Sequence, residues 1–440
     1  MSRDPLPDPH SGATTNSPHR FHFDLLNTPL TQEPHDPNGM MLLGDELHVF
    51  YQHDPSFPAQ PKRTGWGHAV TTLGSGVWRH FPDALYPGVS YDENGCYSGS
   101  GVVHDGQIRL FYTGNVKRDG KRLTSQNIVD VGDIEGPMGG TYHRRDTNPA
   151  IDGPADGYTA HYRDPHVTQA PDGTWRMVLG AQRDNGTGAA VLYTSDDLDT
   201  WQFAGEIEFA GLNYNVASAY MWECPNLLRM RDQATGVMRD VFVFCPQFPD
   251  SDECGYVVGK LEGLRFEVER DFTPLDYGSE FYAPQLISDN NGGALMLGWM
   301  GLPARDDTPT FPAEGWVHQL TLVRELSLID GHLATALQIP DAHDMLVERV
   351  ALGDSSWSAD LVAEGEHVGA TVTWQPDGAG RGTVFVDVAG RIRWAECAAG
   401  ELVLTADGAA VECTAGDGDV AFSFAVFAPG GAQWSALTPQ

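Results

Sequence analysis

The sequence predicts an all-β protein, a five-bladed β-propeller followed by a β-sandwich. Three observations indicate this fold class: helical periodicity is scarce, one type of strand recurs five times, and the residue pattern changes after Leu326. The chain of 440 residues contains 50 glycines and 29 prolines, as expected of many short strands joined by turns. We expect a flexible N-terminal segment at residues 1–20, the propeller at 21–335 and the sandwich at 345–440.

The recurring strand is short, largely apolar and preceded by a turn. Its five copies begin at Glu46, Gln107, Thr174, Asp240 and Gly293, so the intervals are 61, 67, 66 and 53 residues. Each interval has room for a four-stranded blade, and the near-regular spacing indicates radial repetition. On spacing alone, an ordinary series of sandwich strands is the alternative.

A compact polar motif precedes each of these strands, and we expect the motifs to lie in turns. Asp36, Ser98, Asp164 and Tyr282 precede their strands by 10, 9, 10 and 11 residues, and Glu223 precedes its strand by 17, before a longer hairpin loop. The first strand of every blade lines the central channel of a propeller, so the motifs should converge at one end of that channel. A funnel lined by carboxylates, an arginine, a glutamine and aromatic rings suits a sugar.

The last part of the chain, residues 345–440, has a different character. Short strands alternate with turns rich in glycine and aspartate, and no further copy of the polar motifs occurs. This pattern predicts the β-sandwich, for which support or oligomer contact is a better interpretation than catalysis.

The composition excludes several classes of partner. The net charge of −33, from 60 acidic and 27 basic residues, disfavours nucleic acid and anionic membrane. The first twenty residues show no export signal, and no apolar run is long enough to span a bilayer, so we expect a cytoplasmic protein. The six cysteines and 16 histidines fit no metal pattern, so we expect no metal. Cys245 with Cys254, or Cys397 with Cys413, could pair by count, but the missing export signal favours free thiols.

Three carboxylates at the starts of repeats are the candidates for catalysis, because cleavage of a glycosidic bond needs an acid on one side and an ionised carboxylate on the other. Asp36 lies in a turn that two prolines and a glycine hold rigid, as a nucleophile requires. Glu223 follows Trp222, whose ring would desolvate the carboxyl and raise its pKa, as a general acid requires. Asp164 follows Arg163, which would favour the charged form and suit it to bind sugar hydroxyls. Each motif alone also has a structural interpretation: a tight turn for Asp36, a hydrogen-bonded glutamate for Glu223 and a surface ion pair for Asp164.

Together the motifs resemble glycoside hydrolase family 32, which comprises invertases, fructan hydrolases and sucrose-6-phosphate hydrolases. The resemblance covers about residues 20–440 and depends on the order of the motifs. The similar elements are His35-Asp36-Pro37-Asn38-Gly39, Tyr51-Gln52-His53, Trp66-Gly67-His68, Tyr97-Ser98-Gly99-Ser100, Tyr112-Thr113-Gly114, Arg163-Asp164-Pro165, Trp222-Glu223-Cys224-Pro225, Phe281-Tyr282-Ala283-Pro284-Gln285, Gly298-Trp299-Met300 and Arg324-Glu325-Leu326.

The resemblance implies a propeller with a sandwich, no cofactor and a retaining double displacement. Asp36 would form the fructosyl-enzyme bond, Glu223 would act as general acid and base, and Asp164 would stabilise the transition state. The carboxyl groups of a retaining pair lie about 5 Å apart. The residues that would bind the sugar are His35, Gln52, Trp66, Tyr97, Ser98, Arg163 and Tyr282.

The chain departs from the family pattern in three places. Glu33-Pro34-His35 stands where Trp-Met-Asn is usual, His166 stands where Lys is usual, and Asn226 stands where Asp is common. These changes leave the carboxylates intact and bear on the substrate.

The predicted function is retaining hydrolysis of sucrose and of short β-fructosides, with a small sugar as the partner and a homo-oligomer left open. A sucrose-6-phosphate hydrolase, a fructan exo-hydrolase and a fructosyltransferase are alternatives on the same site. For phosphate recognition, the only nearby basic pairs are Lys62-Arg63, Lys117-Arg118 and Lys121-Arg122. The motifs around Glu223 and Ser98 disfavour the inverting arabinan- and xylan-cleaving propellers. Three retained carboxylates disfavour a non-catalytic sugar-binding propeller.

Overall fold

The computed structural model describes residues 35–54, 63–215, 218–301, 319–340, 345–363, 366–426 and 434–439. Within these ranges the strands form seven sheets and no α-helix is present, which confirms the predicted all-β class. Neighbouring strands pair antiparallel, except for one short parallel pair in the fourth sheet.

The first five sheets follow one another along the chain. The first sheet contains β1 (His35–Leu43), β2 (Glu46–His53), β3 (Gly65–Thr72) and β4 (Trp78–Leu85). The second contains β5 (Gly95–His104), β6 (Gln107–Arg118), β7 (Lys121–Gly132), β8 (Thr141–Arg144) and β9 (Ile151–Asp152). The third contains β10 (Tyr158–Gln169), β11 (Trp175–Arg183), β12 (Gly188–Ser195) and β13 (Gln202–Glu206). The fourth contains β14 (Glu208–Ala210), β15 (Met221–Arg231), β16 (Met238–Gln247), β17 (Gly255–Glu262) and β18 (Arg265–Pro274). The fifth contains β19 (Tyr282–Ser288), β20 (Ala294–Trp299), β21 (Arg324–Ile329) and β22 (His332–Leu337).

Two further sheets form a C-terminal unit. One contains β23 (Leu346–Ala351), β28 (Glu401–Asp407), β29 (Ala410–Ala415) and β30 (Val420–Ala425). The other contains β24 (Trp357–Ala363), β25 (Glu366–Pro376), β26 (Arg381–Val388), β27 (Arg391–Ala398) and β31 (Trp434–Pro439). Side chains from both sheets, such as Trp374 and Phe422, share one apolar core. The predicted domain limits at 21–335 and 345–440 stay a prediction, since residues 21–34 and 341–344 lie outside the described ranges.

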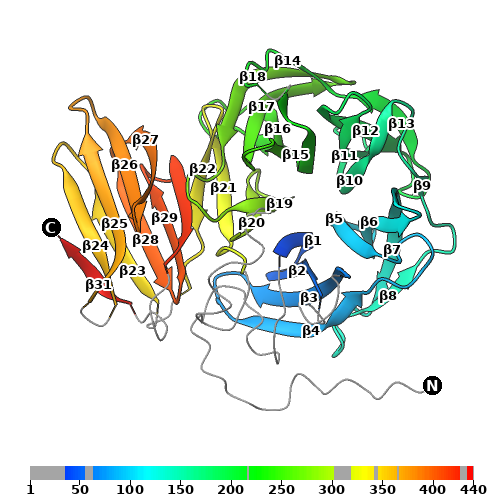
Figure 1. Ribbon diagram of the computed structural model, residues 1–440, viewed down its shortest axis with the longest axis horizontal. Helices are drawn as coiled ribbons and strands as arrows, with labels where there is room; N and C mark the ends of the chain where they lie inside the picture. The colour runs from blue at the N-terminus through cyan, green and yellow to red at the C-terminus, as the bar shows by residue number, and fades with distance from the viewer. Residues whose placement is uncertain are drawn as a thin grey trace.

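The first five sheets surround a common centre, and the C-terminal unit lies to one side of them (Figure 1). In each of the five, the strand of the recurring type predicted from the sequence is the second strand counted from the centre: β2, β6, β11, β16 and β20. The innermost strands are β1, β5, β10, β15 and β19, and each contacts the innermost strands of its two neighbours, with β19 contacting β1. The polar motifs therefore lie on a ring of five strands.

The prediction that the motifs lie in turns is wrong. They lie inside the innermost strands, at points where the hydrogen-bond ladder to the next strand is interrupted. The pairing shifts register at Asp36, Asp164, Cys224 and Ala283. These four residues have φ of 37°, 66°, 47° and 46°, and each precedes a proline. Proline has no N–H for the ladder, so the strand forms a bulge at this point and turns the preceding side chain toward the centre. Positive φ is costly for a residue other than glycine, and such strain gathers at functional sites.

The residue that follows each of these prolines links neighbouring strands of the ring. Asn38 accepts a 2.9 Å hydrogen bond from the backbone N–H of Gly99. Gln285 donates to the carbonyl of Gly99 at 2.6 Å and accepts from the N–H of Met40 at 2.7 Å. Side chains thus replace the backbone partners that the bulges remove.

His166 and Asn226 are two of the departures from the family pattern. Each directly follows the proline of the bulge in its own strand. The N–H of Leu227 donates to Nδ1 of His166 at 3.3 Å, and Nε2 of His166 donates to the carbonyl of Leu286 at 3.2 Å. Asn226 donates to the carbonyl of Pro284 at 3.0 Å and accepts from the N–H of Leu286 at the same distance. Burial lowers the pKa of His166 to about 4, so the ring is neutral, as this pair of contacts requires. These two residues hold the ring together.

Candidate active site

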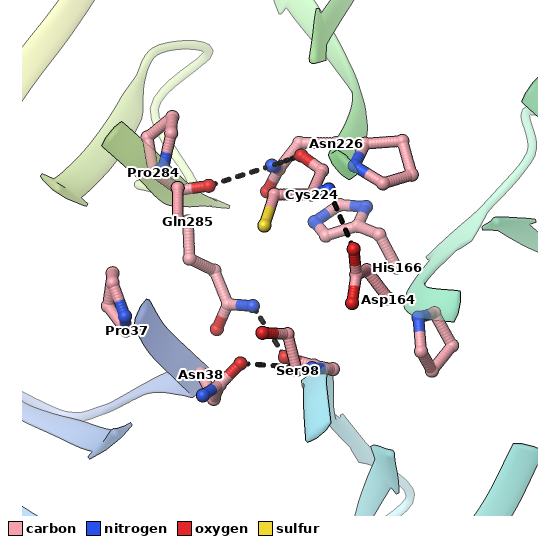
Figure 2. A pocket seen from close by; sticks show the side chains of 13 residues that line it. Pro37, Asn38, Ser98, Asp164, His166, Cys224, Asn226, Pro284 and Gln285 are labelled. Carbon is pink, nitrogen blue, oxygen red and sulfur yellow. Dashed lines mark hydrogen bonds between the residues drawn. The ribbon is translucent and has the colours of Figure 1, made fainter. Parts of the chain in front are cut away.

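A cavity of about 300 Å³ is lined by residues of the innermost strands β1, β5, β10 and β15 and of their neighbours. The three candidate carboxylates, Asp36, Asp164 and Glu223, all lie in its wall. The other residues that line it are His35, Gln52, Thr64, Asn94, Tyr97, Ser98, Lys117, Arg122, Arg163 and Cys224. A much smaller space of about 10 Å³ shares Ser98, Asp164 and Cys224 with it and reaches the linking side chains of the ring (Figure 2). The structure therefore brings the predicted carboxylates to one pocket.

Asp36 is held at both carboxylate oxygens. The hydroxyl of Ser98 donates to Oδ2 at 2.8 Å, and Nε2 of Gln52 donates to the same oxygen at 3.2 Å. Nδ1 of His35 lies 3.3 Å from Oδ1. Gln52 also donates to the hydroxyl of Ser98, so these polar groups form one network. The network orients Asp36, and hydrogen bonds to a carboxylate favour its charged form.

Glu223 is contacted by an arginine and a tyrosine. Arg163 donates to Oε1 from Nη2 at 2.5 Å and from Nε at 3.1 Å, and the hydroxyl of Tyr282 donates to Oε2 at 2.8 Å. Burial, followed by the charge of Glu223, raises the pKa of Tyr282 well above its usual range, so the tyrosine keeps the proton that it donates. The expectation that Trp222 desolvates this carboxyl is wrong. Side chains alternate along a strand, so Trp222 packs on the opposite face against Phe244.

Asp164 is the most buried of the three carboxylates. Its Oδ2 accepts a 2.9 Å hydrogen bond from the backbone N–H of Cys224. Burial raises the pKa of Asp164 to about 7, while Arg163 opposes the shift and Glu223 and Asp36 add to it. Arg163 lies 3.9 Å from Asp164, although its hydrogen bonds go to Glu223. The expected effect of Arg163 on Asp164 is present, but burial outweighs it.

His161 is a member of the site that the sequence did not single out. Its Nδ1 lies 3.1 Å from Nη1 of Arg163 and 3.5 Å from Nη1 of Arg122. Burial lowers its pKa to about 4, and the two arginines add to the shift. The neutral ring can therefore accept from both guanidinium groups and hold them in place.

The remaining predicted residues take up different positions. Tyr97 and Ser98 line the cavity, whereas Trp66 is fully buried behind Tyr97 and donates to its carbonyl at 3.2 Å. Tyr282 is buried and reaches the pocket through its contact with Glu223. Glu33 and the other residues before His35 lie outside the described ranges.

The sequence analysis did not place Thr64, Asn94, Lys117 and Arg122 in the pocket wall. Lys117 is the direct partner of Arg122 in the hairpin of β6 and β7, so both side chains point to the same face of that sheet. Both belong to basic pairs noted in the sequence. The sequence alone did not give the register of this hairpin, in which Lys117 pairs with Arg122 and Arg118 pairs with Lys121. Without the register, it could not be predicted which residue of each basic pair faces the pocket.

No metal site is found in the part of the chain that the structure describes, since no three His, Cys, Asp or Glu side chains gather in a suitable group. The six cysteines are free thiols, as expected. A search of the described residues for a helix long and apolar enough to cross a membrane finds none.

A pocket whose wall holds two hydrogen-bonded carboxyl groups, Asp36 and Glu223, is typical of glycoside hydrolases. The chain belongs to glycosyl hydrolase family 32: the family described as "Glycosyl hydrolases family 32 N-terminal domain" matches residues 28–340. This confirms the family predicted from the sequence motifs.

Several curated proteins are similar to this chain. The sucrose-6-phosphate hydrolase of Bacillus subtilis is 38% identical over 325 residues, which are 71% of this chain and 64% of that protein. The sucrose-6-phosphate hydrolase of Klebsiella pneumoniae is 39% identical over 315 residues, which are 68% and 63% of the two chains. The chain thus spans less than two thirds of the length of these relatives.

Solved structures agree with this placement. The sucrose-6-phosphate hydrolase from Lactobacillus gasseri has a TM-score of 0.79 and 26% identity, covering 96% of this chain and 91% of the other. A mutant of the Bombyx mori β-fructofuranosidase in complex with sucrose has a TM-score of 0.76 and 26% identity, covering 96% and 92%.

Proposed function

We propose that the chain hydrolyses the β-fructofuranosyl bond of sucrose with retention of configuration. The observation that carries this proposal is the different environment of two carboxylates in one cavity. Asp36 accepts hydrogen bonds from Ser98 and Gln52, which suits a charged nucleophile, whereas Glu223 lies between Arg163 and the Tyr282 hydroxyl. Two carboxylates with separate roles are what a retaining mechanism needs.

In the first step, an oxygen of Asp36 attacks the anomeric carbon of fructose while Glu223 protonates the leaving glycosidic oxygen. The bond to glucose breaks, and a fructosyl ester forms on Asp36. In the second step, Glu223 removes a proton from water, which attacks the anomeric carbon and releases Asp36. Asp164 would bind fructose hydroxyls beside the carbon on which positive charge develops.

The fold supports the same proposal. We propose that the five sheets around the ring are the blades of a five-bladed propeller, and that the two C-terminal sheets are a β-sandwich. The innermost strands contact one another in a closed sequence, and each carries its polar motif at a matching position. Such a scaffold places catalytic groups from several strands on rigid elements.

A second candidate substrate, sucrose 6-phosphate, is favoured by the cations in the pocket wall. Lys117 and Arg122 lie on the same face of one hairpin, on the wall that also contains Arg163. In a chain with a net charge of −33, such a group favours an anionic substrate locally. The relatives named above are sucrose-6-phosphate hydrolases. Lys62 lies outside the described residues, while Arg63 donates to backbone carbonyls of Pro87 and Glu93.

The two substrates are separated by comparing kcat/KM for sucrose and for sucrose 6-phosphate, with free fructose as the measured product. If phosphate is recognised, Lys117→Ala should lower kcat/KM for the phosphorylated sugar about tenfold and leave sucrose nearly unchanged. Lys121→Ala is the matched control, because Lys121 is an exposed lysine on the same hairpin, paired with Arg118. Equal effects of Lys117→Ala on both sugars would exclude this role.

Fructan exo-hydrolysis and fructosyl transfer remain alternatives, and a kestose product at high sucrose would reveal transfer. A cytoplasmic location and a homo-oligomer stay predictions from the sequence. If neither sugar nor an inulin- or levan-type oligomer is cleaved, the proposed function is wrong.

A further inference from the structure

One fully buried arginine joins the fifth sheet to the C-terminal unit. The side chain of Arg324, in β21, is 0% exposed, as are those of its partners Asp276 and Glu412. Nη1 donates to Asp276 at 2.9 Å, while Nε and Nη2 donate to Oε2 of Glu412 at 2.9 and 2.5 Å. Nη2 also donates to the hydroxyl of Ser423 at 2.5 Å. A buried ion pair tolerates little displacement, because breaking it leaves an uncompensated charge.

The segment that leads into β19 is also fixed by the C-terminal unit. The backbone N–H groups of Tyr277 and Ser279 donate to carbonyls of Ala421 and Ser423 in β30, at 2.8 and 2.9 Å. A Cβ atom at Gly278 would lie 1.9 Å from the carbonyl oxygen of Ser423, so only glycine allows this approach. The segment is therefore paired with the edge of a C-terminal sheet immediately before it enters the ring.

This segment ends at the residue that contacts the candidate acid. The guanidinium of Arg324 lies 5.0 Å from the centroid of the Phe281 ring, a distance suited to a cation–π interaction. The next residue is Tyr282, whose hydroxyl donates to Glu223 at 2.8 Å. A continuous series of contacts thus runs from Glu412 through Arg324 and Phe281 to the carboxyl in the pocket.

We propose that Arg324 is a positioning residue, through which the C-terminal unit sets the hydrogen bond between Tyr282 and Glu223. This inference rests on the proposed function and assigns the C-terminal sheets a specific part in proton transfer. The hydrogen bonds of Asn226 and Gln285 fix the bulge of β19 within the ring. The contacts of Arg324 fix the same strand at its start. Displacement of Tyr282 would alter the acid and leave Asp36 with its own partners, Ser98 and Gln52.

The test compares two substrates that differ in their need for acid catalysis, sucrose and p-nitrophenyl β-D-fructofuranoside. The variants are Glu412→Gln, which removes the charge and keeps the shape, and Phe281→Leu, which removes the ring contact and leaves the ion pair. We expect each variant to lower kcat/KM, which reports the first step, about tenfold on sucrose and to change kcat/KM on the aryl fructoside less than twofold. Glu401→Gln is the matched control, because Glu401 forms an exposed pair with Arg349 in the same unit, and it should alter neither rate.

Three outcomes would overturn the proposal. Equal losses on both substrates would mean that the contacts serve stability alone. Full additivity of Glu412→Gln with Tyr282→Phe would mean that they act independently. If Glu412→Gln fails to fold, Phe281→Leu carries the same comparison. A crystal structure of either variant with the Tyr282–Glu223 distance unchanged would contradict the proposal without reference to activity. A wild-type protein inactive on both sugars would instead refute the proposed function.

Discussion

The hydroxyl of Tyr282 donates a hydrogen bond of 2.8 Å to Oε2 of Glu223, while Arg163 occupies Oε1. The arginine comes from the third sheet, the glutamate from the fourth and the tyrosine from the fifth. Three innermost strands thus meet at one carboxyl group. Both of its oxygens accept hydrogen bonds, so the carboxyl group is held in one orientation.

Replacement of Glu223 tests its role as acid and base. Glu223→Gln keeps the size of the side chain and removes the exchangeable proton, so kcat on sucrose should fall by about three orders of magnitude. Formation of the fructosyl-enzyme from the aryl fructoside needs little protonation and should fall far less. The measurement is the ratio of the two first-step rates by rapid mixing, and equal losses would argue against an acid role.

Asp164 should weaken the folded state at high pH. Its folded pKa is raised from 3.8 to about 7, chiefly by burial, so the folded protein keeps this proton while the unfolded chain loses it. The stability that this proton provides is complete below about pH 4 and is lost as the pH rises to about 7. Asp164→Asn cannot ionise, so it should lose activity and raise the melting temperature more at pH 8 than at pH 4.5. A gain in melting temperature that does not change with pH would contradict this account.

His166 should matter for stability more than for substrate choice. His166→Ala leaves the N–H of Leu227 and the carbonyl of Leu286 without their partner in the ring. We expect the free energy of unfolding to fall by about 2–4 kcal/mol, as it does when other buried polar groups lose their hydrogen-bond partners. Urea denaturation measures this loss, with the exposed His104→Ala as control. A changed preference between sucrose and sucrose 6-phosphate at unaltered stability would contradict this structural role.

Of the departures from the family pattern within the described ranges, His35 reaches the larger cavity. It lines the cavity, and its Nδ1 lies 3.3 Å from Oδ1 of Asp36. Asparagine keeps a hydrogen-bond donor but lacks the imidazole ring, so His35→Asn should change the ratio of kcat/KM for sucrose to kcat/KM for sucrose 6-phosphate. If this ratio does not change, His35 takes no part in substrate choice.

Much of the fold could be predicted because the second strand of each sheet is a plain apolar strand. The copies that begin near Glu46 and Gln107 match β2 and β6 closely. The bulges could not be predicted, because a proline with neighbouring polar residues is typical of a turn as well as of an interrupted strand. Only the pairing with the second strand shows that Asp36 and Asp164 lie inside a ladder.

The sequence was sufficient to predict which carboxylates lie together in the site. It was not sufficient to predict which groups contact them. The sequence places Trp222 beside Glu223 and Arg163 beside Asp164, yet Trp222 packs against Phe244 outside the cavity wall, and the carboxylate that Arg163 hydrogen-bonds is Glu223. The groups that bond Glu223 are Arg163 and Tyr282, 60 and 59 residues away in the chain. Lys117 and Arg122 became neighbours only through the hairpin register.

The most direct test of the central claim, retaining cleavage through Asp36, is the methanolysis of sucrose. Methanol competes with water for the fructosyl-enzyme, and the methyl fructoside that forms keeps its anomeric configuration, unlike free fructose. The account predicts methyl β-D-fructofuranoside by ¹³C NMR with the wild-type protein, and loss of the product by several orders of magnitude in a folded Asp36→Ala variant. The α anomer, or activity of Asp36→Ala within tenfold of the wild type, would contradict it.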